Sequence, residues 1–249
     1  MKKAYFLSDL HLGASYLEDS RDRERKVVAF LDSVRDDVGE LYLLGDILDY
    51  WFEYRYVVPR GYVRFFGKLA ELSDAGVKIT WLIGNHDIWI FDYIPSELGV
   101  EVVDGVLERD VMGARMVMTH GDGVGHNDLR FRFLRAFFRN RVCQKLYSGV
   151  HPRWTVPFAS AWSSSSRKGG MQRDRSQEIS RNIEALARWS EDYSLRHPGV
   201  GYYLFGHLHV VERRKLPCGA EMVVLGDWLT HFSYATFDGT DFRMHVYGS

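Results

Sequence analysis

The chain repeatedly places polar, metal-binding residue types directly after short apolar runs, and this pattern constrains the fold more than any other feature. In open α/β sheets, ligands bind outside the carboxyl ends of the strands, so the pattern predicts strand ends that converge on one site. A single Gly-Asp or Asn-His pair is a common turn, whereas five recurrences favour a functional site. The five places are Asp9 and His11 after "AYFLS", Asp46 after "LYLL", Asn85 and His86 after "TWLIG", His120 after "RMVMT", and His207 and His209 after "GYYLFG".

The order of the elements predicts an α/β domain with a largely parallel central sheet. Strand-like runs at 4–8, 40–44 and 77–83 alternate with helical patterns at 23–38 and near 60–74, which is a βαβαβ order. Hairpin-like strands are expected around 100–109 and 115–119. Helices are expected at 127–147 and 176–197, and Ser176 is the expected N-cap of the second of these helices. The remaining expected strands are "GYYLF", "EMVVL", "FSYATF" and "FRMHVY".

The candidate ligands indicate the kind of metal site. They combine carboxylate, amide and imidazole donors without a thiolate, which suits Mn²⁺, Fe²⁺ or catalytic Zn²⁺. Seven donors are too many for one catalytic ion with an open position, and they suit two ions that share a carboxylate. The seven are Asp9, His11, Asp46, Asn85, His120, His207 and His209.

The charge is unevenly distributed along the chain. Residues 130–175 hold eleven Lys or Arg and one acidic residue, Asp174, so this segment is +10 and the rest of the chain is −11. Aromatic residues are interleaved with the cations, which favours an anionic partner for this segment. The alternatives are a solvated helix face for the charges and core packing for the aromatics.

Other features bear on location. No run of about eighteen apolar residues occurs, so we expect no spanning helix. The N-terminal segment turns polar within eight residues, so we expect no signal peptide. Cys143 and Cys218 form neither a disulfide framework nor a CxxC pair, which favours a reducing cytoplasm.

The series "DLH", "GDILD", "GNHD", "HGD" and "GHLH", which spans residues 9–209, resembles the calcineurin-like metallophosphoesterase superfamily. The resemblance implies a four-layer α/β/β/α sandwich with a site for two divalent ions, with Mn²⁺ preferred and Fe²⁺, Zn²⁺ or Mg²⁺ as alternatives. It further implies that Asp46 bridges the ions. The first ion would be held by Asp9, His11, Asp46 and His209, and the second by Asp46, Asn85, His120 and His207.

The resemblance also implies catalytic roles near the ions. Asn85 and His207 would contact the phosphate. His86 would stand beside the leaving group, where it either donates a proton or only forms a hydrogen bond. Asp49 would orient His86, and Asp87 is expected to be structural.

Within the superfamily, the chain is most similar to the branch that hydrolyses UDP-2,3-diacylglucosamine in lipid A synthesis. The segments "YLLGDILDYWF", "HGDGVGHNDLRFRFLR" and "VVLGDW" carry this similarity. It implies attack of a metal-bridged hydroxide on the pyrophosphate, which releases UMP and 2,3-diacylglucosamine 1-phosphate. Two departures are His86, where that branch typically has arginine, and Leu208, where it usually has a small polar residue.

The similarity predicts a core at 1–126 and 176–249 and a basic helical cap at 127–175. Asp128 would contact the glucosamine, and Arg132 and Arg135 would bind the phosphates. We expect a nucleotide-linked lipid substrate, peripheral attachment to the cytoplasmic face of the inner membrane and no protein partner. One alternative is a phosphodiesterase or nuclease for a soluble nucleotide or nucleic acid. Another is an inactive scaffold, which predicts lost ligands although all seven are present.

Overall fold

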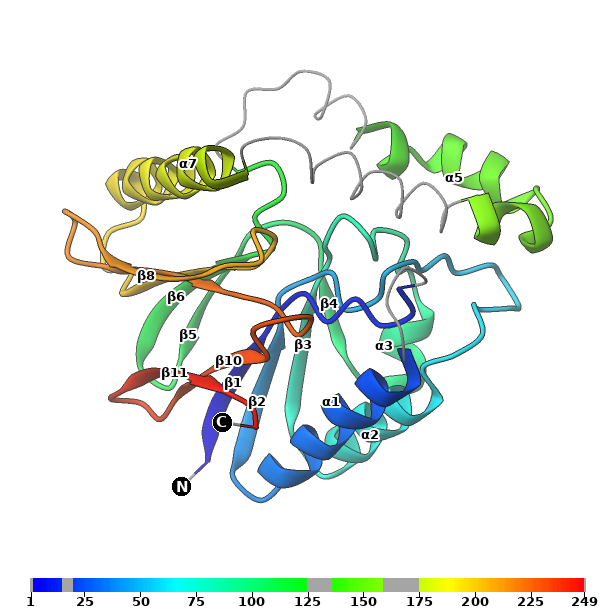
Figure 1. Ribbon diagram of the computed structural model, residues 1–249, viewed down its shortest axis with the longest axis horizontal. Coiled ribbons are helices and arrows are strands. Elements are labelled where there is room, and N and C mark those ends of the chain that lie inside the picture. The colour runs from blue at the N-terminus through cyan, green and yellow to red at the C-terminus, as the bar shows by residue number, and fades with distance from the viewer. Residues whose placement is uncertain (1, 15–19, 125–135, 159–174, 249) are drawn as a thin grey trace.

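The computed structural model describes residues 2–14, 20–124, 136–158 and 175–248. Two β-sheets form the centre of the molecule (Figure 1). The first has the strand order β11-β10-β1-β2-β3-β4 and the second the order β5-β6-β7-β9-β8. Strands β1 to β4 are mutually parallel, as are β6, β7 and β9, and the remaining strands pair antiparallel at the edges.

The strands of the first sheet are β1 (Lys3–Leu7), β2 (Val38–Leu43), β3 (Lys78–Leu82), β4 (Glu101–Val103), β10 (Ser233–Phe237) and β11 (Phe242–Val246). Those of the second sheet are β5 (Leu107–Val111), β6 (Ala114–Thr119), β7 (Tyr202–Phe205), β8 (Val211–Lys215) and β9 (Glu221–Leu225). The helices are α1 (Ser20–Val34), α2 (Val63–Asp74), α3 (Tyr93–Leu98), α5 (Arg141–Ser148) and α7 (Arg175–Arg196).

Three apolar cores hold together the four layers that the family resemblance implied. Alternate residues of a strand face opposite sides of its sheet. In β1, Tyr5 and Leu7 pack toward α1, α2 and α3, whereas Ala4 and Phe6 face the second sheet. The third core lies between the second sheet and α7, so the order is helix, sheet, sheet, helix (Figure 1).

Several expected elements differ in detail. Strand β4 pairs in parallel with β3, so the expected hairpin spacing holds only for β5 and β6. Strand β8, "VERRK", was not expected, because its charges conceal an edge strand. The helix expected over 127–147 is interrupted at Asn140, whose side chain accepts hydrogen bonds from the Val142 and Cys143 amides and caps α5. Ser176 lies inside α7 and is not its N-cap.

The described part of the expected cap, residues 136–158, lies beside the loops that leave β2 and β3. It comprises α5 and helical stretches at 136–139 and 152–158. Tyr147 contacts the Tyr50 hydroxyl at 3.1 Å and stacks on Trp89. Trp89 Nε1 also donates to the Phe138 carbonyl at 2.9 Å. These contacts seat α5 and its flanking stretches against the loops that follow the carboxyl ends of β2 and β3. Figure 1 shows α5 at the edge of the molecule, beyond the sheets.

Within the ranges that the structure covers, no helix is long and apolar enough to cross a membrane.

Candidate metal centre

The loops after β1, β2, β3, β6 and β7 bring the seven predicted ligands together. Among the described residues, three groups have donor atoms within 4.8 Å of one another. The first is Asp9, His11 and His209, the second is Asp46, His120 and His207, and a third, His11, Asp46 and His86, overlaps the other two. Asn85 joins the second group, because its Oδ1 lies 3.3 Å from His120 Nε2. The parallel strands deliver these side chains because their carboxyl ends meet at one edge.

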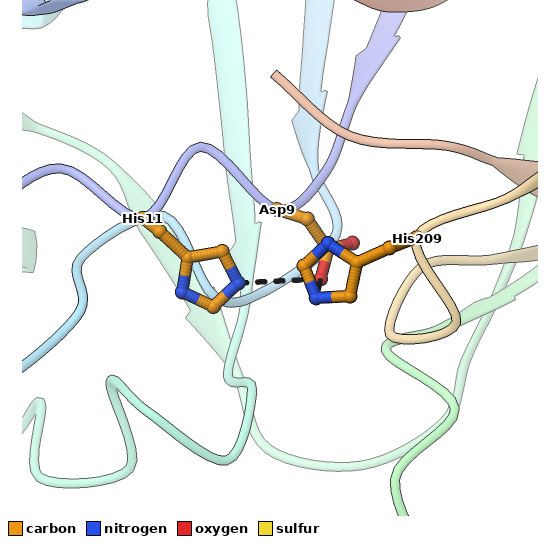
Figure 2. Close-up of side chains that lie close together, drawn as sticks. All are labelled: Asp9, His11 and His209. Atoms are coloured by element: carbon orange, nitrogen blue, oxygen red, sulfur yellow. Dashed lines mark ion pairs between the residues drawn. The ribbon is translucent and has the colours of Figure 1, made fainter. Parts of the chain in front are cut away.

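In the first group, two imidazoles face one carboxylate oxygen (Figure 2). Nε2 of His11 and of His209 lie 3.7 and 3.5 Å from Asp9 Oδ1. Both distances exceed a good hydrogen bond, and this buried oxygen accepts no hydrogen bond from the residues that the structure describes. A buried carboxylate oxygen without a donor is costly. A cation between these three atoms would remove that cost, so the donor set fits a metal.

Asp46 lies between the two groups. Its Oδ2 is 3.6 Å from His11 Nε2 and 3.4 Å from His120 Nε2. The same oxygen therefore faces an imidazole from each group. This is the arrangement that a carboxylate bridging two cations requires.

The backbone at these residues has an uncommon conformation. Eight described non-glycine residues have a positive φ, and five of them are candidate ligands: Asp9, His11, Asp46, His207 and His209. Left-handed backbone is uncommon outside glycine and is enriched in Asp, Asn and His. Such residues cluster where a site dictates side-chain direction.

Backbone amides fix the two carboxylates from their other side. The His207 amide donates to Asp9 Oδ2 at 2.9 Å, and the His86 amide donates to Asp46 Oδ1 at 2.8 Å. One oxygen of each carboxylate is thus held by the protein, while the other faces the imidazoles. Asp87 is buried beneath the site and accepts from the Ile47 and Gly84 amides and from the Trp81 indole, a structural arrangement.

Burial and the neighbouring charges shift the pKa values of several side chains in the centre. Burial opposes ionisation of Asp46, but the charges of His120 and His86 outweigh it and hold its pKa well below the usual range. Burial likewise disfavours the His120 imidazolium, yet Asp46 raises the pKa of that imidazole well above 6.5. Burial, with the charge of His120, lowers the pKa of His207 to about 3.

His86 lies at the edge of the centre and is partly exposed. Its Nδ1 is 3.0 Å from the Asp49 backbone carbonyl and 3.5 Å from the carboxylate Oδ1, and its Nε2 is 4.0 Å from Asp46 Oδ2. Asp49 Oδ1 also lies 3.3 Å from His11 Nδ1. Asp49 therefore contacts both a candidate ligand and His86.

One residue near the centre was not predicted from sequence. Asp227 follows β9 and lies 3.3 Å from His209 Nδ1. The signal was available, since Gly226-Asp227 after an apolar strand repeats the pattern of Gly45-Asp46. Three predicted substrate contacts, Asp128, Arg132 and Arg135, lie outside the described residues.

The fold and this centre are those of a metal-dependent phosphoesterase. A family model described as calcineurin-like phosphoesterase matches residues 2–211, and the chain belongs to that family. It is 41% identical over 248 residues to a UDP-2,3-diacylglucosamine hydrolase of Porphyromonas gingivalis, covering 96% of this chain and 95% of the relative. A UDP-2,3-diacylglucosamine hydrolase of Vibrio atlanticus is 25% identical, covering 97% and 96%.

Among solved structures, a novel archaeal phosphodiesterase aligns over 98% of this chain and 99% of its own, at 11% identity and a TM-score of 0.48. The family assignment does not rest on that likeness.

Proposed function

We propose that the chain hydrolyses the pyrophosphate of UDP-2,3-diacylglucosamine and releases UMP and 2,3-diacylglucosamine 1-phosphate. The observation that carries the reaction class is the convergence of two imidazoles on the unsatisfied oxygen of Asp9 beside the shared carboxylate of Asp46. The substrate is supported by the relative from Porphyromonas gingivalis, which matches over nearly the whole of both chains.

The chain's own residues would prepare the metal site and hold the substrate. Asp9, His11, Asp46 and His209 would bind one cation, and Asp46, Asn85, His120 and His207 the other. When bound, two divalent cations supply Lewis acidity that neutralises phosphate oxygens and lowers the pKa of water. Oxygen and imidazole donors without thiolate are compatible with Mn²⁺, which the family resemblance favours over Fe²⁺, Zn²⁺ or Mg²⁺.

His86 would act on the leaving oxygen. Its Nδ1 can donate to the Asp49 carbonyl at 3.0 Å, which leaves Nε2 directed toward the centre. In its protonated form, the imidazole would give the Nε2 proton to the departing phosphate oxygen, or stabilise the negative charge there by a hydrogen bond. Asp49 would stabilise the charged ring through its carboxylate.

The described part of the cap has the properties of a lipid-facing surface. Residues 136–158 contain three arginines, a lysine and no acidic residue. Four apolar side chains there are more than 60% exposed: Val142, Leu146, Trp154 and Phe158. Cations beside exposed apolar groups suit an anionic bilayer surface, which supports peripheral membrane attachment beside the site.

The decisive assay offers UDP-2,3-diacylglucosamine to the Mn²⁺-loaded protein and measures UMP. An Asp46→Asn variant controls for contaminating hydrolases. UMP release that depends on Asp46 supports the proposal. Hydrolysis of bis-p-nitrophenyl phosphate without UMP release would instead favour a phosphodiesterase for soluble substrates.

Membrane attachment has its own test, sedimentation with vesicles of anionic phospholipid. Trp154→Ser should weaken binding, whereas Leu195→Ser, which changes an 83% exposed leucine on α7, should not. Equal binding by both variants would contradict a lipid-facing role for residues 136–158. Binding that salt alone abolishes would point to a purely electrostatic partner such as nucleic acid.

A further inference from the structure

The side chain of Asp227 divides its contacts between a turn and the metal centre. Oδ1 accepts the amides of Leu229, Thr230 and His231 at 2.8–3.1 Å, which closes the turn after β9. Oδ2 lies 3.3 Å from His209 Nδ1 and also accepts from the Thr230 hydroxyl at 3.3 Å. The carboxylate is 3% exposed, so solvent does not replace either contact.

The turn is also tied directly to the first metal group. The Trp228 amide donates to the Asp9 carbonyl at 3.1 Å, and the opposite ring nitrogen of His209 lies 3.5 Å from Asp9 Oδ1. A chain of contacts therefore runs from Asp227 through the imidazole to the oxygen that faces the metal position. Carboxylate, histidine and metal commonly form such a series, in which the carboxylate fixes the tautomer and direction of the ring.

We propose that Asp227 is a positioning residue that holds His209 as the Nδ1–H tautomer, so that the Nε2 lone pair is directed at the metal position. This inference rests on the proposed metal centre and not on the identity of the phosphoester substrate. His231 Nδ1 is also 3.3 Å from Asp227, but it lies beside Oδ1 and its side chain is 42% exposed.

A single-atom replacement separates the two roles of the carboxylate. In Asp227→Asn, the amide oxygen can still close the turn, while the amide nitrogen faces His209 Nδ1. That nitrogen donates, so the ring must accept at Nδ1 and carry its proton on Nε2, toward the metal position. The matched control is Thr230→Val, which removes a hydroxyl that donates to both Asp227 oxygens, at 3.2 and 3.3 Å, while the carboxylate itself stays beside His209.

The experiment measures Mn²⁺ binding by calorimetry and electron paramagnetic resonance, without substrate. We expect Asp227→Asn to weaken one of the two sites by about 10–100-fold, the usual effect of losing such a partner. The spectrum should change from a coupled pair to a single ion. Thr230→Val should retain both sites. Adding Asp227→Asn to His209→Ala should cost nothing further, because the two residues act on one ligand.

Two results would overturn the proposal. One is unchanged binding at both sites, or equal weakening of both, in Asp227→Asn. The other comes from the wild-type metal-free protein, which avoids any folding defect: nitrogen NMR should find His209 protonated at Nδ1, and protonation at Nε2 alone contradicts the inference. Because neither measurement uses a lipid substrate, failure of the proposed substrate leaves this test intact.

Discussion

Trp89 stacks on Tyr147 with ring centroids 5.0 Å apart, and this pair joins the loop after β3 to residues 136–158. Trp89 stands three residues after His86, and its indole also donates to the Phe138 carbonyl. We predict that Trp89→Leu loosens residues 136–158, raising KM for UDP-2,3-diacylglucosamine severalfold while hydrolysis of bis-p-nitrophenyl phosphate changes little. Steady-state kinetics on both substrates test this, with Leu195→Ser, an exposed apolar position on α7 outside residues 136–158, as the control. Equal losses on both substrates would show that Trp89 supports His86 itself.

Asp46→Asn should remove most activity and at least one bound ion. A neutral amide cannot offset two adjacent dications, and Asp46 Oδ2 faces imidazoles from both groups. Elemental analysis of metal content, together with a melting curve to verify folding, checks this. Metal content and turnover near those of the wild type would mean that the shared-carboxylate assignment is wrong.

His86→Gln should affect substrates according to their leaving group. For a substrate whose leaving oxygen needs a proton, kcat of the variant should fall on the order of 10²–10⁴-fold, the usual contribution of general acid catalysis. A nitrophenolate leaves without a proton, so its hydrolysis should fall much less. The ratio of the two rates is the measurement, and equal losses would assign His86 to binding or geometry.

Metal binding should release a proton from His120 at neutral pH. Asp46 holds the pKa of that imidazole well above 6.5 against the effect of burial, and a bound metal requires the neutral ring. Affinity should therefore rise as pH rises toward the raised pKa. His207, with a pKa of about 3, is already neutral and should release none. Calorimetry in buffers of different ionisation enthalpy counts the protons, and identical apparent enthalpies would contradict the prediction.

The raised pKa of His120 makes metal affinity rise with pH, but it makes the folding stability of the metal-free protein fall with pH. A histidine whose folded pKa is raised stabilises the fold fully below its unfolded value, and this contribution is lost as pH rises through the folded pKa. The His120 contribution to metal-free stability should therefore decline above pH 6.5. Chemical denaturation of the chelated wild type and of His120→Gln across this range measures it.

Glu53→Gln should destabilise the fold near α3. The Glu53 carboxylate is 5% exposed; Oε1 accepts from the Trp51 indole, and Oε2 accepts from the amides of Phe91, Asp92 and Tyr93. An amide nitrogen cannot accept, so one end loses its partners, at a cost of about 1–3 kcal/mol for each orphaned group. Denaturant unfolding measures the change. The exposed Glu97→Gln is the matched control and should be within error of wild type.

Much of the centre could be predicted because its ligands are adjacent in sequence to the strands that carry them. Asp9, Asp46, Asn85 and His207 each follow an apolar run, and parallel pairing brings those ends together. Asp227 obeys the same pattern, but its contact with His209 depends on the arrangement of β9 beside β7, which no local signal encodes.

Other misses have equally local causes. The charges of "VERRK" hide strand β8, because an edge strand need not bury alternate residues. The break at Asn140 was missed because an apolar period continued through a residue whose side chain caps the next helix. The exposed apolar side chains of residues 136–158 were visible only as composition, since the exposure of Trp154 or Leu146 depends on tertiary packing.

At the five candidate ligands with left-handed backbone, a substitution that stabilises the fold would also remove a metal-binding side chain. A strained torsion in a non-glycine residue costs on the order of 1–3 kcal/mol, whereas glycine adopts it freely. Replacing His207 or His209 with glycine would therefore remove the conformational cost in the metal-free protein, but it would also remove an imidazole ligand. Selection for heat resistance alone would favour glycine at these ligand positions as much as at Tyr62, Met112 and Phe232, which share the left-handed backbone. Only a screen that also demands turnover would preserve the ligands.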